Sequence, residues 1–206
     1  MNQNRITVEK SGIRTLVFAT NNAHKVREIQ EVIGPGARLL SPADLGYFGE
    51  IPEERDTIEG NAEQKARFIY DRFGNDCFAD DTALEIDALS GAPGVHSARF
   101  AGAGCTFEDN MNRVLSAMNG VANRKARFRT VIALIEEGRL FTFIGEIKGI
   151  ITTEKRGRQG FGYDPIFIPD GFDLTFAEMD PREKNRISHR ALAVKKLVIY
   201  LSGIEP

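Results

Sequence analysis

The stretch Cys77-Phe78-Ala79-Asp80-Asp81-Thr82-Ala83-Leu84-Glu85-Ile86-Asp87 places two adjacent carboxylates directly after a short apolar run. The apolar run predicts the end of a buried strand, which would stop at Asp80 and Asp81. Burying a pair of carboxylates costs free energy unless a cation shares the site. Oxygen ligands at a strand end suit a hard cation such as Mg²⁺, which can bridge to substrate phosphates. A solvated Asp-Asp turn is the alternative that this stretch leaves open.

The composition narrows the class of protein. The chain has 206 residues, of which 42% are hydrophobic and 27% charged, and this suits one large domain or two closely packed lobes. Its net charge of −2 offers no global basic field for nucleic acid or an anionic membrane, and no apolar run approaches the length of a membrane span. Residues 1–13 predict a flexible N-terminal extension, and residues 14–206 a single domain. Cys77 and Cys105 match no metal spacing and indicate reduced thiols in a cytoplasmic protein.

A strand, a polar turn and a helix follow one another near the start of the chain. Thr15 to Ala19 predicts a strand buried on both faces, and a helical pattern later stops at Gly34-Pro35-Gly36. The turn between them, Thr20-Asn21-Asn22-Ala23-His24-Lys25, is a ready anion site because free N–H groups point out of the first helical turn. Lys25 opposes the helix dipole there, so phosphate binding explains it better than helix stability does. An asparagine N-cap with a solvated lysine is the alternative.

A second helix is expected after the charged loop Ile51-Pro52-Glu53-Glu54-Arg55. Asp56 and Glu59 resemble a capping box that opens this helix. Asn61 and Lys65 lie one turn apart on a face of their own. That face is either the wall of a polar pocket or simply a wet helix surface.

Two later segments, residues 126–135 and 140–151, predict a β-hairpin whose first strand has one face more buried than the other. The loop Gly160-Phe161-Gly162-Tyr163-Asp164-Pro165 would let the backbone approach a flat ligand. Phe161 or Tyr163 would then stack on a base. An ordinary loop with its aromatic side chains in the core is the alternative.

A basic group of residues marks the start of the last helix. Ser188 is its natural N-cap, which puts His189 and Arg190 in the first turn, with Lys184 just upstream. The helix dipole disfavours cations there, so a bound acceptor-rich ligand accounts for them better than local stability does.

Taken together, the cations, the carboxylates and the aromatic loop describe a nucleoside triphosphate site. Lysines would hold phosphates, carboxylates would hold Mg²⁺, and an aromatic ring would stack on the base. The sequence has no Gly-x-x-x-x-Gly-Lys-Ser/Thr motif, so this is not a P-loop protein. It also shows no serine or cysteine nucleophile with a histidine partner, which argues against a covalent intermediate.

The chain resembles the inosine/xanthosine triphosphate pyrophosphatase family, the Ham1/RdgB-like pyrophosphatases of noncanonical purine nucleotides. The resemblance covers nearly everything from Thr15 to Leu201, and the matching segments occur in the family's order. They are Ala19 to Glu28, Asn61-Ala62 with Lys65-Ala66, Ala79-Asp80-Asp81-Thr82, Gly91-Ala92-Pro93-Gly94 with Ser97-Ala98-Arg99, Gly160 to Pro165, and Ser188-His189-Arg190.

The resemblance implies an α/β fold with a long, mixed, twisted central sheet flanked by helices, and two lobes with the active site in their cleft. It implies Mg²⁺-dependent cleavage of ITP, dITP and XTP between the α- and β-phosphates. The products would be a nucleoside monophosphate and pyrophosphate, so these nucleotides would be removed from the pool. It also implies a cytoplasmic homodimer that binds neither nucleic acid nor membrane.

The family's functional residues carry over to the matching positions. Asp81 would be the general base that deprotonates the attacking water, and Glu53, Asp80 and Asp81 would hold Mg²⁺. His189 and Arg190 would read the 6-oxo group of the base. The full set implied for substrate binding is Thr20, Asn21, Asn22, Ala23, His24, Lys25, Lys65, Thr82, Phe161, Gly162, Tyr163, Asp164, Lys184, His189 and Arg190.

The chain departs from the family pattern at two places. Asp80-Asp81-Thr82-Ala83 replaces the usual Asp-Asp-Ser-Gly, which keeps the hydroxyl but loses the φ freedom of glycine. Glu53-Glu54-Arg55 replaces Glu-Thr-Gly, so Glu54 rivals Glu53 as metal ligand. Two other functions stay open: a Maf-like pyrophosphatase for modified pyrimidine nucleotides, against which Ser188-His189-Arg190 argues, and a nucleotide-binding module without catalysis.

Overall fold

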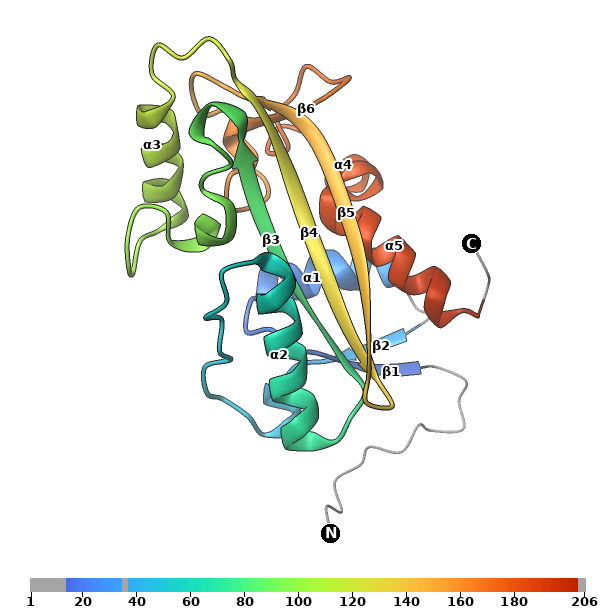
Figure 1. Ribbon diagram of the computed structural model, residues 1–206. Coiled ribbons are helices and arrows are strands. Elements are labelled where there is room, and N and C mark those ends of the chain that lie inside the picture. The colour runs from blue at the N-terminus through green and yellow to red at the C-terminus, as the bar shows by residue number, and fades with distance from the viewer. Residues whose placement is uncertain (1–13, 35–36, 204–206) are drawn as a thin grey trace. The chain divides into compact units, whose positions relative to one another are not determined.

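The computed structural model describes residues 14–34 and 37–203, and the expected N-terminal extension, residues 1–13, lies outside them. Six strands form one sheet in the order β2-β1-β3-β4-β5-β6. β1 pairs in parallel with β2 and β3, whereas β5 and β6 are antiparallel, so the expectation of a mixed sheet flanked by helices is confirmed (Figure 1). The strands are β1 (Arg14–Phe18), β2 (Ala37–Leu40), β3 (Cys77–Ile86), β4 (Lys125–Glu136), β5 (Arg139–Ile151) and β6 (Phe167–Pro169).

Five α-helices lie in the described ranges, together with short 3-10 turns. The helices are α1 (Ala23–Ile33), α2 (Ile58–Phe73), α3 (Phe107–Ala117), α4 (Pro181–Ile187) and α5 (His189–Leu201). The 3-10 turns are η2 (Ala43–Leu45), η3 (Asp87–Leu89), η4 (Gly94–Arg99) and η5 (Asp164–Ile166). Within these ranges no helix combines the length and the apolar character that crossing a lipid bilayer requires.

The chain divides into two compact units. Unit 1 holds the described residues up to Asp81 together with residues 130–144 and those from Ala193 onward, and unit 2 holds residues 82–129 and 145–192. β3, β4, β5 and α5 each begin in one unit and end in the other. On β3 the boundary falls at the peptide bond that follows Asp81. The single catalytic domain over residues 14–206 stays a prediction.

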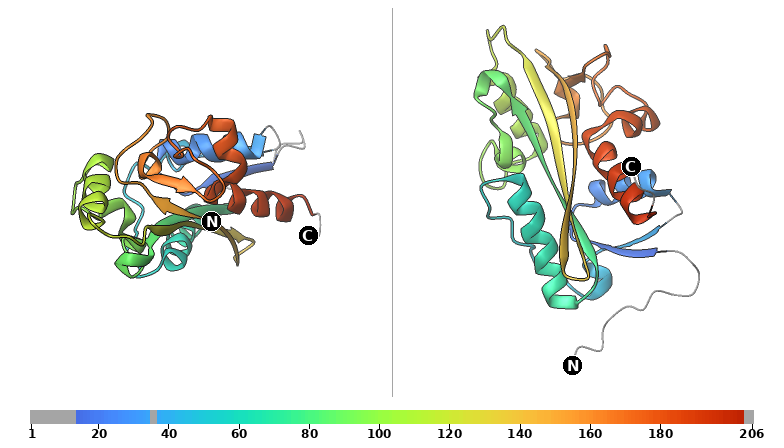
Figure 2. Two further views of the ribbon diagram at one scale, coloured as in Figure 1. Left: turned by 90° about the horizontal axis from the view of Figure 1, so that it is seen from above. Right: turned by 45° about the vertical axis from the view of Figure 1, so that its right-hand side comes forward.

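The core of unit 1 forms where β1 meets β3, and β1 and β2 lie side by side in the right-hand view of Figure 2. Phe18 and Phe78 are register partners whose buried rings stack with 4.6 Å between centroids. β1 ends at Phe18, but β3 continues to Ile86 because β4 is its neighbour on the other side. The prediction that the strand stops at Asp80 and Asp81 is therefore wrong: the two aspartates follow the end of β1.

The start of α2 also differs from the sequence prediction. The N-cap is Thr57, whose extended backbone lets Oγ1 accept a hydrogen bond from the Gly60 N–H at 3.1 Å. The predicted capping box of Asp56 and Glu59 is wrong for this reason. The helix ends at Gly74, which has the left-handed conformation of a C-cap.

β4 and β5 form the predicted hairpin. Its two-residue turn, Glu137 and Gly138, has φ of 50° and 79°, and positive φ at both positions is what a type I′ turn requires. The predicted difference in burial between the two faces of β4 holds only in the first half of the strand, where Arg127 is exposed and Phe128 is buried. Residues 131–135 are all fully buried, so the prediction is wrong there. Such a run is typical of a strand that is covered on both faces.

The sequence analysis did not predict α4. Asp180 is its N-cap and Pro181 its first residue, a pairing that favours a helix start. α5 begins at His189 as predicted, and Ser188 Oγ accepts a hydrogen bond from the Ala191 N–H at 3.2 Å. Lys184 therefore lies on α4, and His189 is the first residue of α5.

Candidate active site

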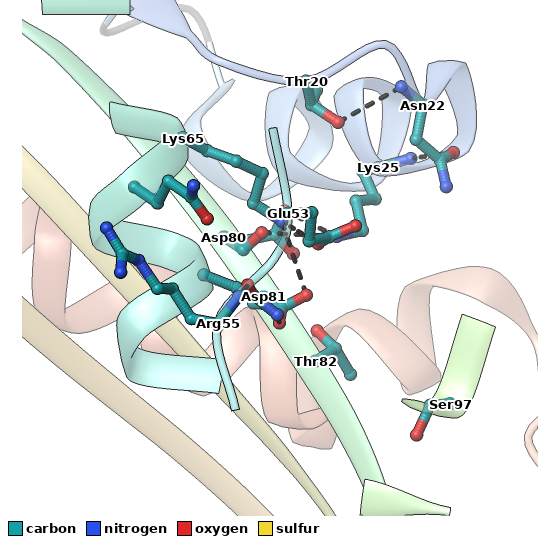
Figure 3. A network of polar contacts seen from close by, with 12 residues as sticks. Thr20, Asn22, Lys25, Glu53, Arg55, Lys65, Asp80, Asp81, Thr82 and Ser97 are labelled. Atoms are coloured by element: carbon teal, nitrogen blue, oxygen red, sulfur yellow. Dashed lines mark hydrogen bonds and ion pairs between the residues drawn. The ribbon is translucent and has the colours of Figure 1, made fainter. Parts of the chain in front are cut away.

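Five charged side chains of unit 1, which we call the carboxylate–lysine cluster, come together around β3 (Figure 3). β3 supplies two of them, just past the end of β1, and their side chains contact Lys25 of α1 and Lys65 of α2. The loop before α2 supplies the third carboxylate. The members are Lys25, Glu53, Lys65, Asp80 and Asp81.

Asp80 is paired with Lys25. The Lys25 ammonium lies 2.9 Å from Asp80 Oδ1, and the Asp80 side chain is fully buried. Removing the lysine would leave a buried charge without its cation. The alternative of a solvated Lys25 is therefore wrong.

Asp81 shares Lys65 with Glu53. Lys65 Nζ lies 3.4 Å from Asp81 Oδ1 and also donates to Glu53 Oε1. Asp81 Oδ2 accepts a hydrogen bond of 3.2 Å from Nδ2 of Asn61. Each oxygen of the Asp81 carboxylate thus has a donor, and the two donors come from successive turns of α2.

The two carboxyls at Lys65 titrate differently. Burial raises the pKa of Asp81 to about 6, and the Glu53 carboxyl adds to the rise while Lys65 and Lys25 oppose it. Burial also acts to raise the pKa of Glu53, but attraction to Lys65 outweighs it and leaves the pKa below its usual value. Burial alone would lower the pKa of Lys65, yet the pKa is raised because Asp81, Glu53 and Asp80 surround it. A carboxyl with a pKa near 6 suits a general base that works around neutral pH.

The cluster fits a divalent cation because its carboxylates outnumber its lysines. It carries one net negative charge when all its members are ionised, which would repel a polyphosphate. Within residues 14–34 and 37–203 no three His, Cys, Asp or Glu side chains form a complete metal site. Mg²⁺ is commonly held by one or two carboxylates with substrate phosphates as further ligands, and Glu53 and Asp81 meet that requirement.

The geometry also separates the two candidate glutamates. Glu53 contacts Lys65 inside the cluster. Glu54 is exposed, and its backbone N–H donates to Oε1 of Gln64 at 3.0 Å. The position of Glu53 therefore favours it as the ligand.

The turn before α1 is organised by its own side chains. Asn22 is the N-cap, and its Oδ1 accepts hydrogen bonds from the backbone N–H groups of His24 at 2.9 Å and Lys25 at 3.3 Å. Thr20 Oγ1 accepts from the Asn22 N–H at 3.1 Å, and Asn21 Nδ2 donates to the carbonyl of Gly49 at 3.0 Å. The asparagine N-cap that the sequence analysis left open is confirmed. Contacts from Thr20 to Lys25, including exposed Ala23, with a triphosphate stay a prediction.

Unit 2 holds a second group of predicted residues, the aromatic–cation cluster of Phe161, Asp164, Lys184, His189 and Arg190. Lys184 Nζ lies 2.7 Å from Asp164 Oδ2, and both side chains are buried. The Phe161 N–H donates to the same oxygen at 2.8 Å. A Cβ at Gly160, where φ is +75°, would lie 2.0 Å from this oxygen. Glycine is thus required for the loop to wrap around the carboxylate.

The Phe161 ring lies close to two cations. Lys184 Nζ and Arg190 Cζ are each 5.4 Å from its centroid. Arg190 Nη2 also donates a hydrogen bond of 3.2 Å to Thr82 Oγ1. Thr82 stands where the family usually has serine, so the hydroxyl that the threonine keeps has a partner. The His189 ring stacks on Phe128 with 4.5 Å between centroids. These contacts place a π-face and several donors in one region of unit 2.

Tyr163 belongs to the core of unit 2. Its ring is buried, and its hydroxyl donates to the carbonyl of Ser97 at 2.8 Å. Burial raises the pKa of Tyr163 well above its ordinary value, so it stays protonated and serves as a donor. Of the two aromatic residues considered for stacking on a base, Phe161 is the partly exposed one. Roles for Gly162 and Tyr163 in substrate binding stay predictions.

The sequence analysis left open whether Asn61 and Lys65 line a polar pocket or a wet helix surface. Asn61 is fully buried and contacts Asp81, so its face of α2 is not a wet surface. The available signal was its spacing of four residues from Lys65, which puts both side chains on one face of the helix.

The chain is similar in sequence to known proteins over most of its length. The model of the Ham1 family matches residues 16–200. A protein from Flavobacterium johnsoniae named dITP/XTP pyrophosphatase is 51% identical over 188 residues, which cover 91% of this chain and 98% of that protein. A protein of the same name from Porphyromonas gingivalis is 50% identical over 187 residues, 90% of this chain and 96% of that one.

Solved structures extend the similarity to the fold. A HAM1 protein from Coxiella burnetii is 36% identical with a TM-score of 0.85, and the match covers 93% of this chain and all of that one. The Ham1 protein of Staphylococcus aureus is 33% identical with a TM-score of 0.84 and the same coverage. The chain therefore belongs to the Ham1 family.

Proposed function

We propose that this chain is a nucleoside triphosphate pyrophosphatase that hydrolyses dITP, ITP and XTP to the monophosphate and pyrophosphate. The observation that carries the proposal is the buried Asp81 carboxylate, which has a raised pKa and lies beside Glu53 and Lys65. The name dITP/XTP pyrophosphatase, borne by relatives about half identical over nine tenths of the chain, supports the same substrate class.

In the proposed reaction Asp81 removes a proton from a water molecule. The water oxygen bonds to the α-phosphorus as the bond from that phosphorus to the bridging oxygen breaks, and pyrophosphate leaves with the bonding electrons. Lys25 and Lys65 stabilise the charge of the phosphates. No covalent bond forms between enzyme and substrate, in keeping with the absence of a nucleophile motif in the sequence.

The proposed cofactor is Mg²⁺. Glu53 and Asp81 would hold it, with Asp80 as a supporting carboxylate. When bound, Mg²⁺ supplies charge neutralisation of the phosphates. The excess of carboxylates over lysines in the cluster supports this assignment.

The aromatic–cation cluster is proposed to bind the base and sugar. Phe161 would stack on the purine. Arg190 and His189 would donate to the 6-oxo group, which inosine and xanthine carry and adenine lacks. A site built from donors rejects adenine because the 6-amino group presents hydrogens instead of an acceptor.

The decisive test is Mg²⁺-dependent release of pyrophosphate from ITP, XTP, dITP, GTP, ATP and dTTP. We expect rapid release from ITP, XTP and dITP and slow release from ATP. Equal rates on ATP and ITP, or orthophosphate as the product, would overturn the proposal. A preference for pyrimidine nucleotides would favour the Maf-like alternative, and binding without any hydrolysis would indicate a nucleotide-binding module.

We also propose that the protein is a cytoplasmic homodimer, as the family resemblance implies. A substrate drawn from the nucleotide pool supports that compartment. Light scattering coupled to size exclusion would test the assembly, since a dimer has twice the 22.9 kDa mass of the chain.

A further inference from the structure

Asn61 uses both ends of its amide in a fully buried position on α2. Its Oδ1 accepts a hydrogen bond from the Arg55 N–H at 2.8 Å, which anchors the loop that carries Glu53. Its Nδ2 donates to Asp81 Oδ2 at 3.2 Å. One side chain therefore connects the loop before α2 with the carboxylate on β3.

The contact at Asp81 differs in kind from the contact made by Lys65. The lysine is charged, is shared with Glu53 and lies 3.4 Å from Asp81 Oδ1. The amide of Asn61 is neutral, so it constrains the carboxylate without neutralising it. With one oxygen held by Lys65 and the other by Asn61, the plane of the Asp81 carboxylate is fixed by two donors on a rigid helix.

We propose that Asn61 is a positioning residue for the hydrolysis, acting through its Nδ2 hydrogen bond to Asp81. The inference rests on the proposed role of Asp81 as general base. Proton transfer from water needs the accepting oxygen at hydrogen-bond distance and in the correct direction, and a small misplacement is costly. Asn61 itself does not contact the reacting atoms.

A purely structural role is the competing explanation, and Asn110 provides a matched control for it. Asn110 of α3 is also buried, its Oδ1 accepts from the Ala101 N–H at 2.8 Å, and its Nδ2 donates to the Ala98 carbonyl at 3.1 Å. The two asparagines anchor loops in the same way. They differ in the acceptor of Nδ2, which is a carboxylate for Asn61 and a backbone carbonyl for Asn110.

The experiment compares Asn61→Asp, Asn61→Ala and Asn110→Asp. Asparagine to aspartate keeps the acceptor for the loop and removes the donor, so it separates anchoring from positioning. We expect kcat for ITP to fall on the order of tenfold to hundredfold in both Asn61 variants, with KM changed by less than about threefold. Asn110→Asp should lower the melting temperature and leave kcat within about twofold of the wild type. Affinity for inosine monophosphate with EDTA present, measured by calorimetry, should be unchanged in Asn61→Asp.

Each other outcome contradicts the proposal. Full kcat in Asn61→Asp would show that Asn61 only anchors the loop. Loss of kcat in Asn61→Asp but not in Asn61→Ala would assign the effect to repulsion by the new carboxylate. If Asn61→Ala does not fold, neutral Asn61→Gln replaces it, because the added methylene displaces the amide and should also lower kcat. A wild-type protein that releases no pyrophosphate would overturn the proposed function instead.

Discussion

The two polar clusters have opposite charge balances. The carboxylate–lysine cluster of unit 1 contains three carboxylates and two lysines, whereas the aromatic–cation cluster of unit 2 sets Lys184 and Arg190 against the single carboxylate of Asp164. A site with excess negative charge needs a cation before it can hold phosphates. A site with excess donors suits a neutral base rich in acceptors. The contrast supports the proposal that the first cluster carries the chemistry and the second recognises the base.

The clusters are also built differently. Asp81 lies on a strand and is held by the side chains of Asn61 and Lys65 from a helix. Asp164 is held partly by the backbone, since its Oδ2 accepts from the Phe161 N–H as well as from Lys184. A substitution in the carboxylate–lysine cluster should therefore alter the rate of hydrolysis of every substrate. A substitution in the aromatic–cation cluster should alter either the fold of a loop or the relative rates on different substrates.

The largest effect is expected from Asp81→Asn, which keeps the shape of the side chain but removes the base. We expect kcat to fall roughly 10²- to 10⁴-fold, by a similar factor for ITP, dITP and XTP, because the proton acceptor is common to all of them. Initial rates of pyrophosphate release measure this. Asp44→Asn is the matched control, since Asp44 of η2 lies in the same unit and its carboxylate accepts from Ser41. Unequal losses among the three substrates would break the division between chemistry and recognition.

The second largest effect is expected from breaking the buried ion pair of Lys184 and Asp164 in unit 2. Lys184→Met leaves Asp164 buried without its cation, which costs about 3–5 kcal/mol of stability. The melting temperature should fall by roughly 6–20 °C for a protein of this size. Combining Lys184→Met with Asp164→Asn should recover most of that loss, because the uncompensated charge is gone. A double variant no more stable than Lys184→Met, in thermal denaturation without ligand, would contradict this account.

Local signals in the sequence were sufficient for much of the fold and for most members of both clusters. Thr15 to Ala19, the hairpin and the start of the last helix have patterns that depend on neighbouring residues alone. The pairing of Asp80-Asp81 with a cation also followed from chemistry, since buried carboxylates need compensation. The family resemblance then assigned the residues to one site.

Some of the failures concern long-range contacts, whereas the incorrect capping box of Asp56 and Glu59 is a local one. The prediction that β3 stops at Asp80 used only the apolar run before it, and the strand continues because β4 lies beside it. Residues 131–135 are buried on both faces for a similar reason, since no alternation in a sequence reveals what covers the second face of a sheet. The partner of Asn61 could not be predicted because Asp81 is 20 residues away along the chain.

A smaller effect is expected from Arg190→Lys, which keeps the positive charge and removes the planar guanidinium. The lysine cannot reproduce the fork of donors that contacts Thr82 and a base together, so we expect the ratio of kcat/KM for ITP over ATP to fall about tenfold. Activity on ATP should change little, so activity on ITP should fall by about the same factor as the ratio does. Arg156→Lys is the control, since the Arg156 guanidinium lies in the same unit and pairs with Glu178. An equal loss on ITP and ATP would move Arg190 from recognition to chemistry.

The smallest effect on catalysis is expected from modification of the two thiols, one of which lies in each unit. Burial raises the pKa of Cys77 to about 12, and the Asp76 carboxylate adds to the rise, so at pH 8 only roughly one part in 10⁴ is thiolate. Cys105 is half-buried. Iodoacetamide at pH 8 should therefore label Cys105 in the native protein and both thiols after unfolding, as peptide mass spectrometry can measure. Labelling of native Cys77 as fast as Cys105 would contradict a sealed core behind Asp80, because Cys77 lies three residues before it on the same strand.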